Sequence, residues 1–186
     1  MHTKEKIIQK ATQLFAHSGY EVLSMRTLAQ SIPITPSVLY HHFKDKDVLL
    51  KAMFDHVNRQ LGIQRKKLPT VTTASEMLFQ RIIFQLDHAE EIVAVLKYYI
   101  TYRKKFKKNP TGFVPEKTAL HIEEVLRFGI ETDEFMVRDV VNDAKIITHA
   151  INGFLLEYFP AKLTKTEKKS IAVPLHAFLL RALRKE

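Results

Sequence analysis

The chain has 186 residues, a length that suits one domain or two small domains packed together. Hydrophobic residues make up 46% of it and charged residues 26%, which is typical of globular proteins and excludes a disordered chain. The absence of cysteine excludes disulfides, thiolate metal sites and cysteine nucleophiles. The 29 Lys and Arg residues outnumber the 20 Asp and Glu residues, and the resulting net charge of +9 favours nucleic acid or an anionic membrane surface as partner.

The sequence contains no signal for export or membrane insertion. Residues 1–6 include no apolar segment and no cleavage site of small residues. No window approaches 18 consecutive apolar residues, the length that a membrane-spanning helix requires. We therefore expect a soluble, cytoplasmic protein without a membrane partner.

Apolar residues recur at helical spacing along almost the whole chain, and the 5 glycines and 7 prolines are too few for a sandwich or barrel. An all-α fold is expected. Capping and breaking residues divide the first 50 residues into three helices and begin a fourth at residue 46. These residues are the N-caps Thr3, Ser24, Thr35 and Asp45 and the breaks at Gly19 and Pro33.

Longer and more aromatic helices are expected beyond Pro69. Their ranges are 73–88, 90–106, 116–131, 137–159 and 165–184. They can build a helical bundle with a core of its own. We therefore expect two domains, an N-terminal three-helix domain over 1–50 and a C-terminal bundle over 51–186, linked by the helix that starts at residue 46.

The segment 24–50 has the dimensions of a helix-turn-helix: a short capped helix, a break and a second short capped helix. The second helix of this motif enters the major groove of DNA, so its outer positions carry small or hydrogen-bonding side chains and its inner positions are apolar. The expected inner residues are Val38, Leu39 and Phe43, and the expected outer residues are Thr35, Pro36, Ser37, Tyr40 and His41. A small helical hairpin without DNA-binding function remains the alternative.

These residues resemble the signature of the tetracycline-repressor (TetR) family. The similar segments are Leu28-Ala29-Gln30-Ser31-Ile32, Ile34 to Phe43 with its Leu39-Tyr40-His41-His42-Phe43 ending, and Lys46 to Leu50. The preceding helix, with Ala11, Leu14 and Phe15 before Gly19-Tyr20, is also similar. The resemblance covers roughly the first 50 residues. One departure is Pro33, which stands where the family usually has glycine in the turn.

The resemblance implies DNA-binding roles for particular residues. It places Ser37, Tyr40 and His41 on the groove-facing side, and Arg26, Thr27, Tyr40 and Lys46 near phosphates. The expected DNA-binding set, with the first residues of the recognition helix, is Arg26, Thr27, Thr35, Pro36, Ser37, Tyr40, His41 and Lys46. The free N–H groups at helix N-termini suit phosphate oxygens. A lysine in the first turn of a helix opposes the helix dipole, so an external phosphate would compensate Lys46; pairing with Asp45 or Asp47 is the alternative.

The resemblance also implies a function. We expect a homodimeric transcriptional regulator, a repressor that binds a palindromic double-stranded DNA operator and is released by a small-molecule effector. Two recognition helices must lie about 34–36 Å apart to occupy both half-sites. A ligand that prefers a conformation with another spacing would shift the population off DNA.

The C-terminal helices suggest two further sites. An apolar or aromatic effector could occupy a cavity with the polar anchors Tyr98, Tyr102, His121, His149 and Asn152, although an ordinary bundle core explains the same aromatic residues. The last two helices carry wide apolar faces that favour a dimer interface. The residues expected there are Ile151, Phe154, Leu155, Tyr158, Leu175, Phe178 and Leu179. The alternative is that these faces are all interior.

Metal binding and catalysis are not expected. His41 and His42 are adjacent on a helix and point about 100° apart, so they cannot share one ion. His121 and Glu124 have i, i+3 spacing but lack a partner motif. No phosphate loop or nucleophile elbow is visible. We expect no enzyme activity, cofactor, metal or catalytic residue. A helical enzyme or ligand-binding protein that uses the aromatic cavity and a basic membrane-surface protein remain the alternatives.

Overall fold

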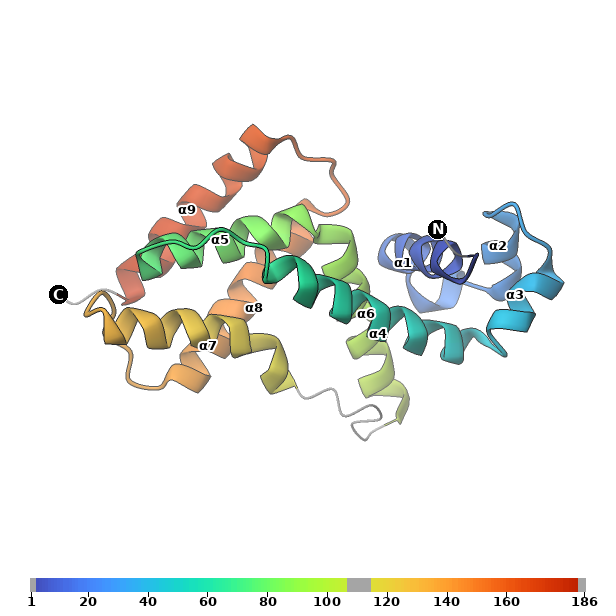
Figure 1. Ribbon diagram of the computed structural model, residues 1–186, viewed down its shortest axis with the longest axis horizontal. Helices are drawn as coiled ribbons and strands as arrows, with labels where there is room; N and C mark the ends of the chain where they lie inside the picture. Colours follow the sequence, from blue (N-terminus) through green and yellow to red (C-terminus); the bar gives the residue numbers. More distant parts are fainter. Residues whose placement is uncertain (1–2, 107–114, 184–186) are drawn as a thin grey trace. The chain divides into compact units, whose positions relative to one another are not determined.

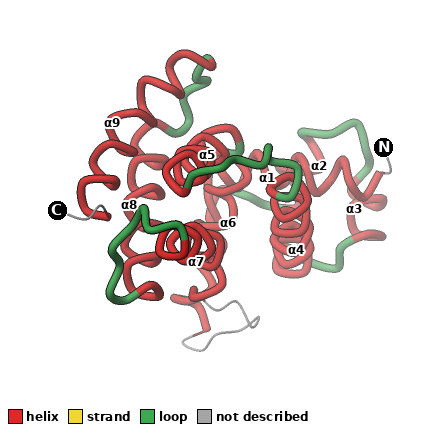
Figure 2. The backbone as a smooth tube through the Cα atoms, turned by 60° about the vertical axis from the view of Figure 1, so that its left-hand side comes forward, coloured by secondary structure: helices red, strands yellow, loops and turns green. Residues whose placement is uncertain are grey.

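The computed structural model describes residues 3–106 and 115–183, and every regular element in these ranges is an α-helix (Figures 1 and 2). The helices are α1 (Thr3–Val22), α2 (Met25–Gln30), α3 (Pro36–His42), α4 (Lys46–Arg65), α5 (Ala74–Asp87), α6 (Ala89–Phe106), α7 (Pro115–Glu131), α8 (Val140–Tyr158) and α9 (Lys165–Leu183). The predicted all-α fold is confirmed. The helices beyond Pro69 begin and end within one helical turn of the expected residues.

The expected capping residues explain where the N-terminal helices start. Side-chain oxygens of Ser24, Thr35 and Asp45 accept hydrogen bonds from backbone N–H groups in the first turns of α2, α3 and α4, respectively. Gly19 has a positive φ of 76°, which favours glycine, but its ψ of −170° is extended and not left-handed helical as expected; the helix kinks there and continues to Val22. α9 runs through Pro174.

The helices pack into two compact units. The first unit takes in α1 to α4 and α6 from Glu90 onward, and the second takes in α5, α7, α8 and α9. The chain therefore leaves the first unit after Lys66 and returns to it at Glu90. The functional division expected at residue 50 stays a prediction.

In the first unit, α1 packs against α4 and α2, and α2 packs against α3. The core contains fully buried apolar side chains from α1 to α4, namely Ile7, Phe15, Leu28, Leu39, Leu50 and Met53, together with Phe43 from the loop after α3. Phe43 is the C-cap residue of α3, and its N–H donates to the Leu39 carbonyl at 2.9 Å, so the two buried side chains lie together at the end of the short helix. This apolar anchor holds α3 in place and leaves its other face exposed.

In the second unit, α7 packs against α8, and α5 packs against α9, α7 and α8. Figure 2 shows α7 and α8 side by side. The buried apolar side chains include Leu78, Ile82, Ile122, Val125, Leu126, Ile151 and Leu175. No helix in the described part of the chain is long and apolar enough to span a membrane.

Candidate nucleic-acid interface

The helix α2 begins with a reciprocal capping box. The Thr27 N–H donates to Ser24 Oγ at 3.0 Å, and the Ser24 N–H donates to Thr27 Oγ1 at 2.9 Å. The Thr27 hydroxyl also donates to the Ser24 carbonyl. A phosphate bound by the Thr27 hydroxyl would therefore compete with the hydrogen bonds by which this hydroxyl caps α2. Its neighbour Arg26 is exposed and carries a positively charged guanidinium group.

The turn between α2 and α3 is built around Pro33. The Ile34 N–H donates to the Ile32 carbonyl at 2.8 Å, which closes a three-residue γ-turn with proline at its centre. The inverse γ-turn needs φ near −75° at its central residue, close to the value that a proline ring imposes. Proline therefore fits this turn, and a left-handed glycine is not required at this position.

The exposed face of α3 carries the residues expected to read DNA. Thr35, Pro36, Ser37, Tyr40 and His41 are all exposed, and 54% of Tyr40 is accessible. The Val38 N–H donates to Thr35 Oγ1 at 3.4 Å, so the Thr35 hydroxyl caps the helix.

The expected inner position of Val38 is wrong. Its side chain is 37% exposed, whereas Leu39 and Phe43 are buried as expected. Val38 lies about 100° from Leu39 around the helix, at the edge of the apolar anchor. The outer face of α3 therefore includes one aliphatic side chain next to the polar ones.

Lys46 contacts the end of α1. Its Nζ donates to the Tyr20 carbonyl at 2.7 Å and to the Leu23 carbonyl at 2.9 Å, and it lies 3.6 Å from the centre of the Tyr20 ring. These carbonyls, at and just beyond the C-terminal end of α1, attract a cation, and the ring face adds a cation–π contact. The cation that opposes the α4 dipole is thus compensated inside the unit, and its expected phosphate contact stays a prediction.

The start of α4 has an acidic cap. Asp45 Oδ1 accepts a hydrogen bond from the Val48 N–H at 2.8 Å. A phosphate at this helix end would meet the negative charge of Asp45. The side chains that cap α2 and α3 are neutral hydroxyls and bring no such charge. The expected phosphate contacts at the three helix N-termini stay predictions.

Sequence reasoning missed Asp47. Its Oδ1 accepts hydrogen bonds from the Tyr20 hydroxyl at 2.9 Å and from the Tyr102 hydroxyl at 2.8 Å. Burial is the largest cause that raises the pKa of Tyr102, and the hydrogen bond to Asp47 and the negative charge of Asp47 raise it further. The Tyr102 hydroxyl therefore stays protonated and can donate a hydrogen bond. No local sequence pattern reveals this cluster, because it depends on α6 lying beside α4.

The expected effector residues are distributed over both units. Tyr98 and Tyr102 are buried in the first unit, where their rings stack with centroids 4.2 Å apart. Burial, followed by the charges of Asp55 and Asp47, raises the pKa of Tyr98 to about 12. In the second unit, His121 and Asn152 are half-buried and His149 is exposed. Ligand binding by these residues stays a prediction.

The residues expected at the dimer interface differ in their exposure to solvent. Four of them are buried within the protomer: Ile151, Leu155, Leu175 and Leu179. Phe154 is 36% exposed, Phe178 is 59% exposed and Tyr158 is half-buried. An interface on these helices would therefore use Phe154, Phe178 and Tyr158, while the other four hold α8 and α9 on their own core.

The described residues contain no group of three or more His, Asp or Glu side chains that could hold a metal ion. His121 and Glu124 do not form part of such a group. His41 and His42 instead pack edge to face, with ring centroids 5.4 Å apart.

Comparison with known proteins relates the helix-turn-helix to bacterial regulators. Residues 7–53 match the family model of bacterial regulatory proteins of the tetR family. The chain is 25% identical over 141 residues to the biofilm operon icaADBC HTH-type negative transcriptional regulator IcaR of Staphylococcus aureus strain Newman, covering 73% of this chain and 74% of IcaR. A shorter match to the HTH-type transcriptional regulator UidR of Escherichia coli K12 is 35% identical over 51 residues and covers 27% of this chain and 26% of UidR.

Solved structures share the fold over nearly the full length. The ketosteroid transcriptional regulator KstR2 of Mycobacterium tuberculosis superposes with a TM-score of 0.77 at 17% identity, covering 100% of this chain and 96% of KstR2. A transcriptional regulator from Saccharomonospora viridis, solved in complex with choline, gives 0.75 at 19% identity and covers 98% of both chains. PfmR of Thermus thermophilus, a TetR family regulator, gives 0.72 at 21% identity and covers 100% of both chains.

Proposed function

Since the chain belongs to the TetR family of bacterial regulatory proteins, we propose that it represses transcription as a homodimer bound to a palindromic operator. Regulators of this family bind DNA and typically act as dimers. The observation that carries the proposal is the surface of α3, where polar side chains face outward over the buried anchor of Leu39 and Phe43.

Recognition would take place through the exposed face of α3 in the major groove. Ser37 and His41 are four residues apart and lie opposite the buried Leu39, so they would point most directly at base edges. Tyr40 would lie at the groove edge, and Arg26 would contact a phosphate. Phosphate contacts would position the protein, and the contacts of α3 with bases would select the sequence.

Repression is proposed from the relative IcaR, which is named a negative transcriptional regulator. Two copies of α3 about 34–36 Å apart would occupy half-sites one turn of DNA apart. The dimer contact is proposed for the exposed parts of α8 and α9 around Phe154 and Phe178. Large exposed aromatic side chains are the residues that most favour burial in an interface.

The DNA-binding proposal is tested by selecting bound sequences from a random pool of duplex DNA and footprinting the selected site. We expect a palindrome with half-sites one helical turn apart. His41→Ala should change the preferred bases, with a loss of about 1–3 kcal/mol for a base contact. Gln9→Ala, an exposed substitution on α1, is the matched control. Selection of no sequence by the wild-type protein would contradict the proposal.

We also propose that a small molecule binding to the second unit releases the operator. KstR2 is named a ketosteroid transcriptional regulator, and the Saccharomonospora viridis structure holds choline. In this chain, Gln85 Oε1 and Thr148 Oγ1 are buried and have no hydrogen-bond partner among the residues that the structure describes. Unpaired buried acceptors are costly, so a ligand with hydrogen-bond donors would suit them.

This part of the proposal is tested with Thr148→Val, which replaces the hydroxyl by a methyl group of similar size. Without ligand, the variant should be more stable than the wild type by about 1 kcal/mol, because an unpaired hydroxyl has been removed. A panel of small aromatic and aliphatic compounds is screened by thermal shift and by release of the selected operator. A compound that releases the wild-type protein from the operator should release the variant from it less well. Equal release would contradict the role of Thr148.

A further inference from the structure

Asp47 joins three helices of the first unit. It lies in the first turn of α4 and accepts hydrogen bonds from Tyr20 in α1 and Tyr102 in α6 through the same oxygen, Oδ1. The two tyrosine rings meet edge to face, with centroids 6.4 Å apart. A carboxylate with two phenol donors forms charge-assisted hydrogen bonds, which are shorter and stronger than neutral ones. This cluster therefore restrains the start of α4 from two sides.

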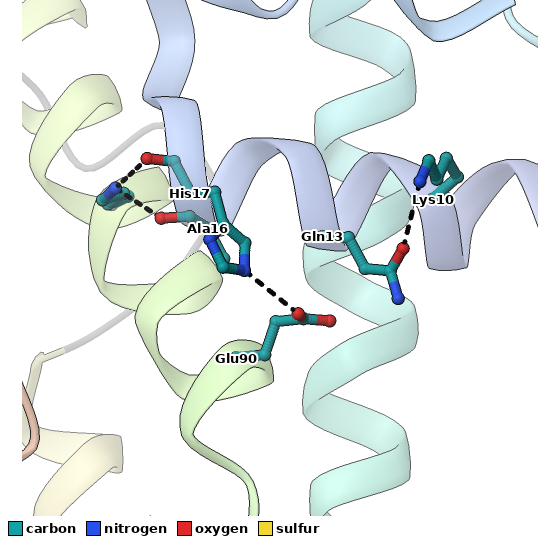
Figure 3. A network of polar contacts seen from close by, with 6 residues as sticks. Lys10, Gln13, Ala16, His17 and Glu90 are labelled. Atoms are coloured by element: carbon teal, nitrogen blue, oxygen red, sulfur yellow. Dashed lines mark hydrogen bonds and ion pairs between the residues drawn. The ribbon is translucent and has the colours of Figure 1, made fainter. Parts of the chain in front are cut away.

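The helix α6 is held in the first unit by further contacts with α1 and α4. The Lys97 ammonium donates to the carbonyls of Ala16 and His17 near the end of α1. His17 Nε2 lies 3.3 Å from Glu90 Oε2, at the start of α6 (Figure 3). The Tyr98 ring stacks on Phe54 of α4 with a centroid distance of 4.5 Å. Residues of α6 from its first turn to Tyr102 thus contact α1 or α4.

The restrained end of α4 adjoins the proposed DNA-reading helix. Only Phe43, Lys44 and Asp45 separate the last residue of α3 from Lys46. Phe43 is buried in the core and the Lys46 ammonium is bonded to the end of α1, so the loop has little freedom at either end. A shift of Asp47 would move the start of α4 and, through this short loop, the orientation of α3.

We propose that Tyr102 is a positioning residue for operator binding: its hydroxyl holds Asp47, and Asp47 fixes the start of α4 and thereby the direction of α3. This inference rests on the proposed function, because it assigns to α6 the control of the same DNA-reading surface.

The test uses Tyr102→Phe in the full-length protein and the operator selected as described above. This variant keeps the ring that stacks on Tyr98 and removes only the hydroxyl that bonds to Asp47. Affinity is measured for the selected operator and for a version with one base pair inserted between the half-sites. We expect about tenfold weaker binding to the selected operator, as for loss of a hydrogen bond to a charged group. The preference for the original spacing should also decrease, because α3 would sample more directions.

Ile7→Val is the control for a general loss of stability. It removes one buried methyl group from α1 without touching Asp47, and it should keep the spacing preference of the wild type. Asp47→Asn, which retains one acceptor oxygen, should bind the operator better than Asp47→Ala. Unchanged affinity and spacing preference in Tyr102→Phe would overturn the inference while leaving the proposed function intact. If the wild type selects no DNA, both the function and this inference are overturned.

Discussion

The ring of Phe135 lies so close to Gly129 that a β-carbon on Gly129 would come within 2.1 Å of Phe135 Cδ2. Gly129 lies in the last turns of α7, and its carbonyl accepts hydrogen bonds from the N–H groups of Glu134 and Phe135. The chain therefore folds back over the end of α7 and buries Phe135. Residue 129 must be glycine because the Phe135 ring leaves no space for a β-carbon.

Gly129→Ala should therefore destabilise the second unit. A methyl group at this position must displace a buried ring, and overpacking of this kind costs about 1–3 kcal/mol. The expected gain in helix propensity from glycine to alanine is smaller, about 1 kcal/mol. Chemical denaturation should show a net loss of stability. Gly62→Ala in α4 is the matched control, because a β-carbon there meets no atom of the described part of the chain within 4 Å. Equal or greater stability of Gly129→Ala would contradict this packing.

Glu134 predicts a dependence of stability on pH. Its carboxylate accepts hydrogen bonds from the Ala74 and Ser75 N–H groups at the start of α5 and from the Thr132 hydroxyl. Burial alone would raise the pKa of Glu134, but these hydrogen bonds together lower it below its usual value of 4.5. The carboxylate therefore stabilises the folded state above this pH, and its contribution is lost as the pH falls below it.

Glu134→Gln should cost about 1 kcal/mol at pH 7, because a weaker neutral acceptor replaces a carboxylate at a helix N-terminus. The difference in unfolding free energy between variant and wild type should shrink as the pH is lowered from 5 toward 3. Urea denaturation at several pH values measures it. Glu131→Gln, an exposed substitution at the end of α7, serves as control. A difference that stays constant down to pH 3 would show that the charge of Glu134 contributes nothing.

Most of the fold could be predicted from the sequence because its signals are local. Caps such as Ser24, Thr35 and Asp45 and the apolar spacing within each helix depend on neighbouring residues. The exposed face of α3 followed from the same spacing, except at Val38, which lies at the edge between the two faces. At a helical angle near 100° from the buried residue, tertiary packing determines whether a side chain is buried or exposed.

The partners of single polar groups could not be predicted, because they come from distant segments. Lys46 bonds to carbonyls of Tyr20 and Leu23, and Asp47 bonds to Tyr102, more than 50 residues away in the chain. The sequence alone offered only solvent, a phosphate or an adjacent aspartate as partners of Lys46. Which aromatic residues are buried in which unit likewise depends on how α6 packs, a relationship that periodicity within one helix does not contain.

Lys46 and Arg26 should differ in their effects on stability. Lys46→Ala removes an ammonium that donates to two carbonyls, and we expect a loss of about 1–3 kcal/mol in unfolding free energy. Arg26→Ala removes an exposed cation and should make the slope of log affinity against log salt concentration shallower by about 1 with little effect on stability. Binding titrations over a range of salt concentrations measure the slopes, and chemical denaturation measures the stabilities. A slope shallower by about 1 in Lys46→Ala would assign a phosphate contact to Lys46.

Phe178→Asp should convert the proposed homodimer into a monomer of 21.6 kDa. The side chain is 59% exposed in the protomer, so a charge there does not disturb the core but opposes burial in an interface. Sedimentation at micromolar concentration measures the mass, and circular dichroism checks that the helices are retained. Leu120→Asp changes another apolar side chain, 49% exposed on α7, and should leave the dimer intact. A wild-type protein that sediments as a monomer would contradict the proposed homodimer, and a Phe178→Asp variant that remains dimeric would exclude Phe178 from the interface.

Pro33→Gly tests the turn between the two helices of the motif. The γ-turn from Ile32 to Ile34 needs a central φ close to the one that proline already has. Glycine can adopt this conformation, but its unfolded chain has more conformational freedom, so the variant should be less stable by about 0.4–1 kcal/mol. Its helices should be unchanged, and because glycine would let α3 sample more directions, the operator should be bound no more tightly than by the wild type. Thermal denaturation and operator titration of the same preparation measure both quantities. A variant that is both more stable and a tighter binder would show that Pro33 strains the turn, and the directions assigned to Ser37, Tyr40 and His41 would then be wrong.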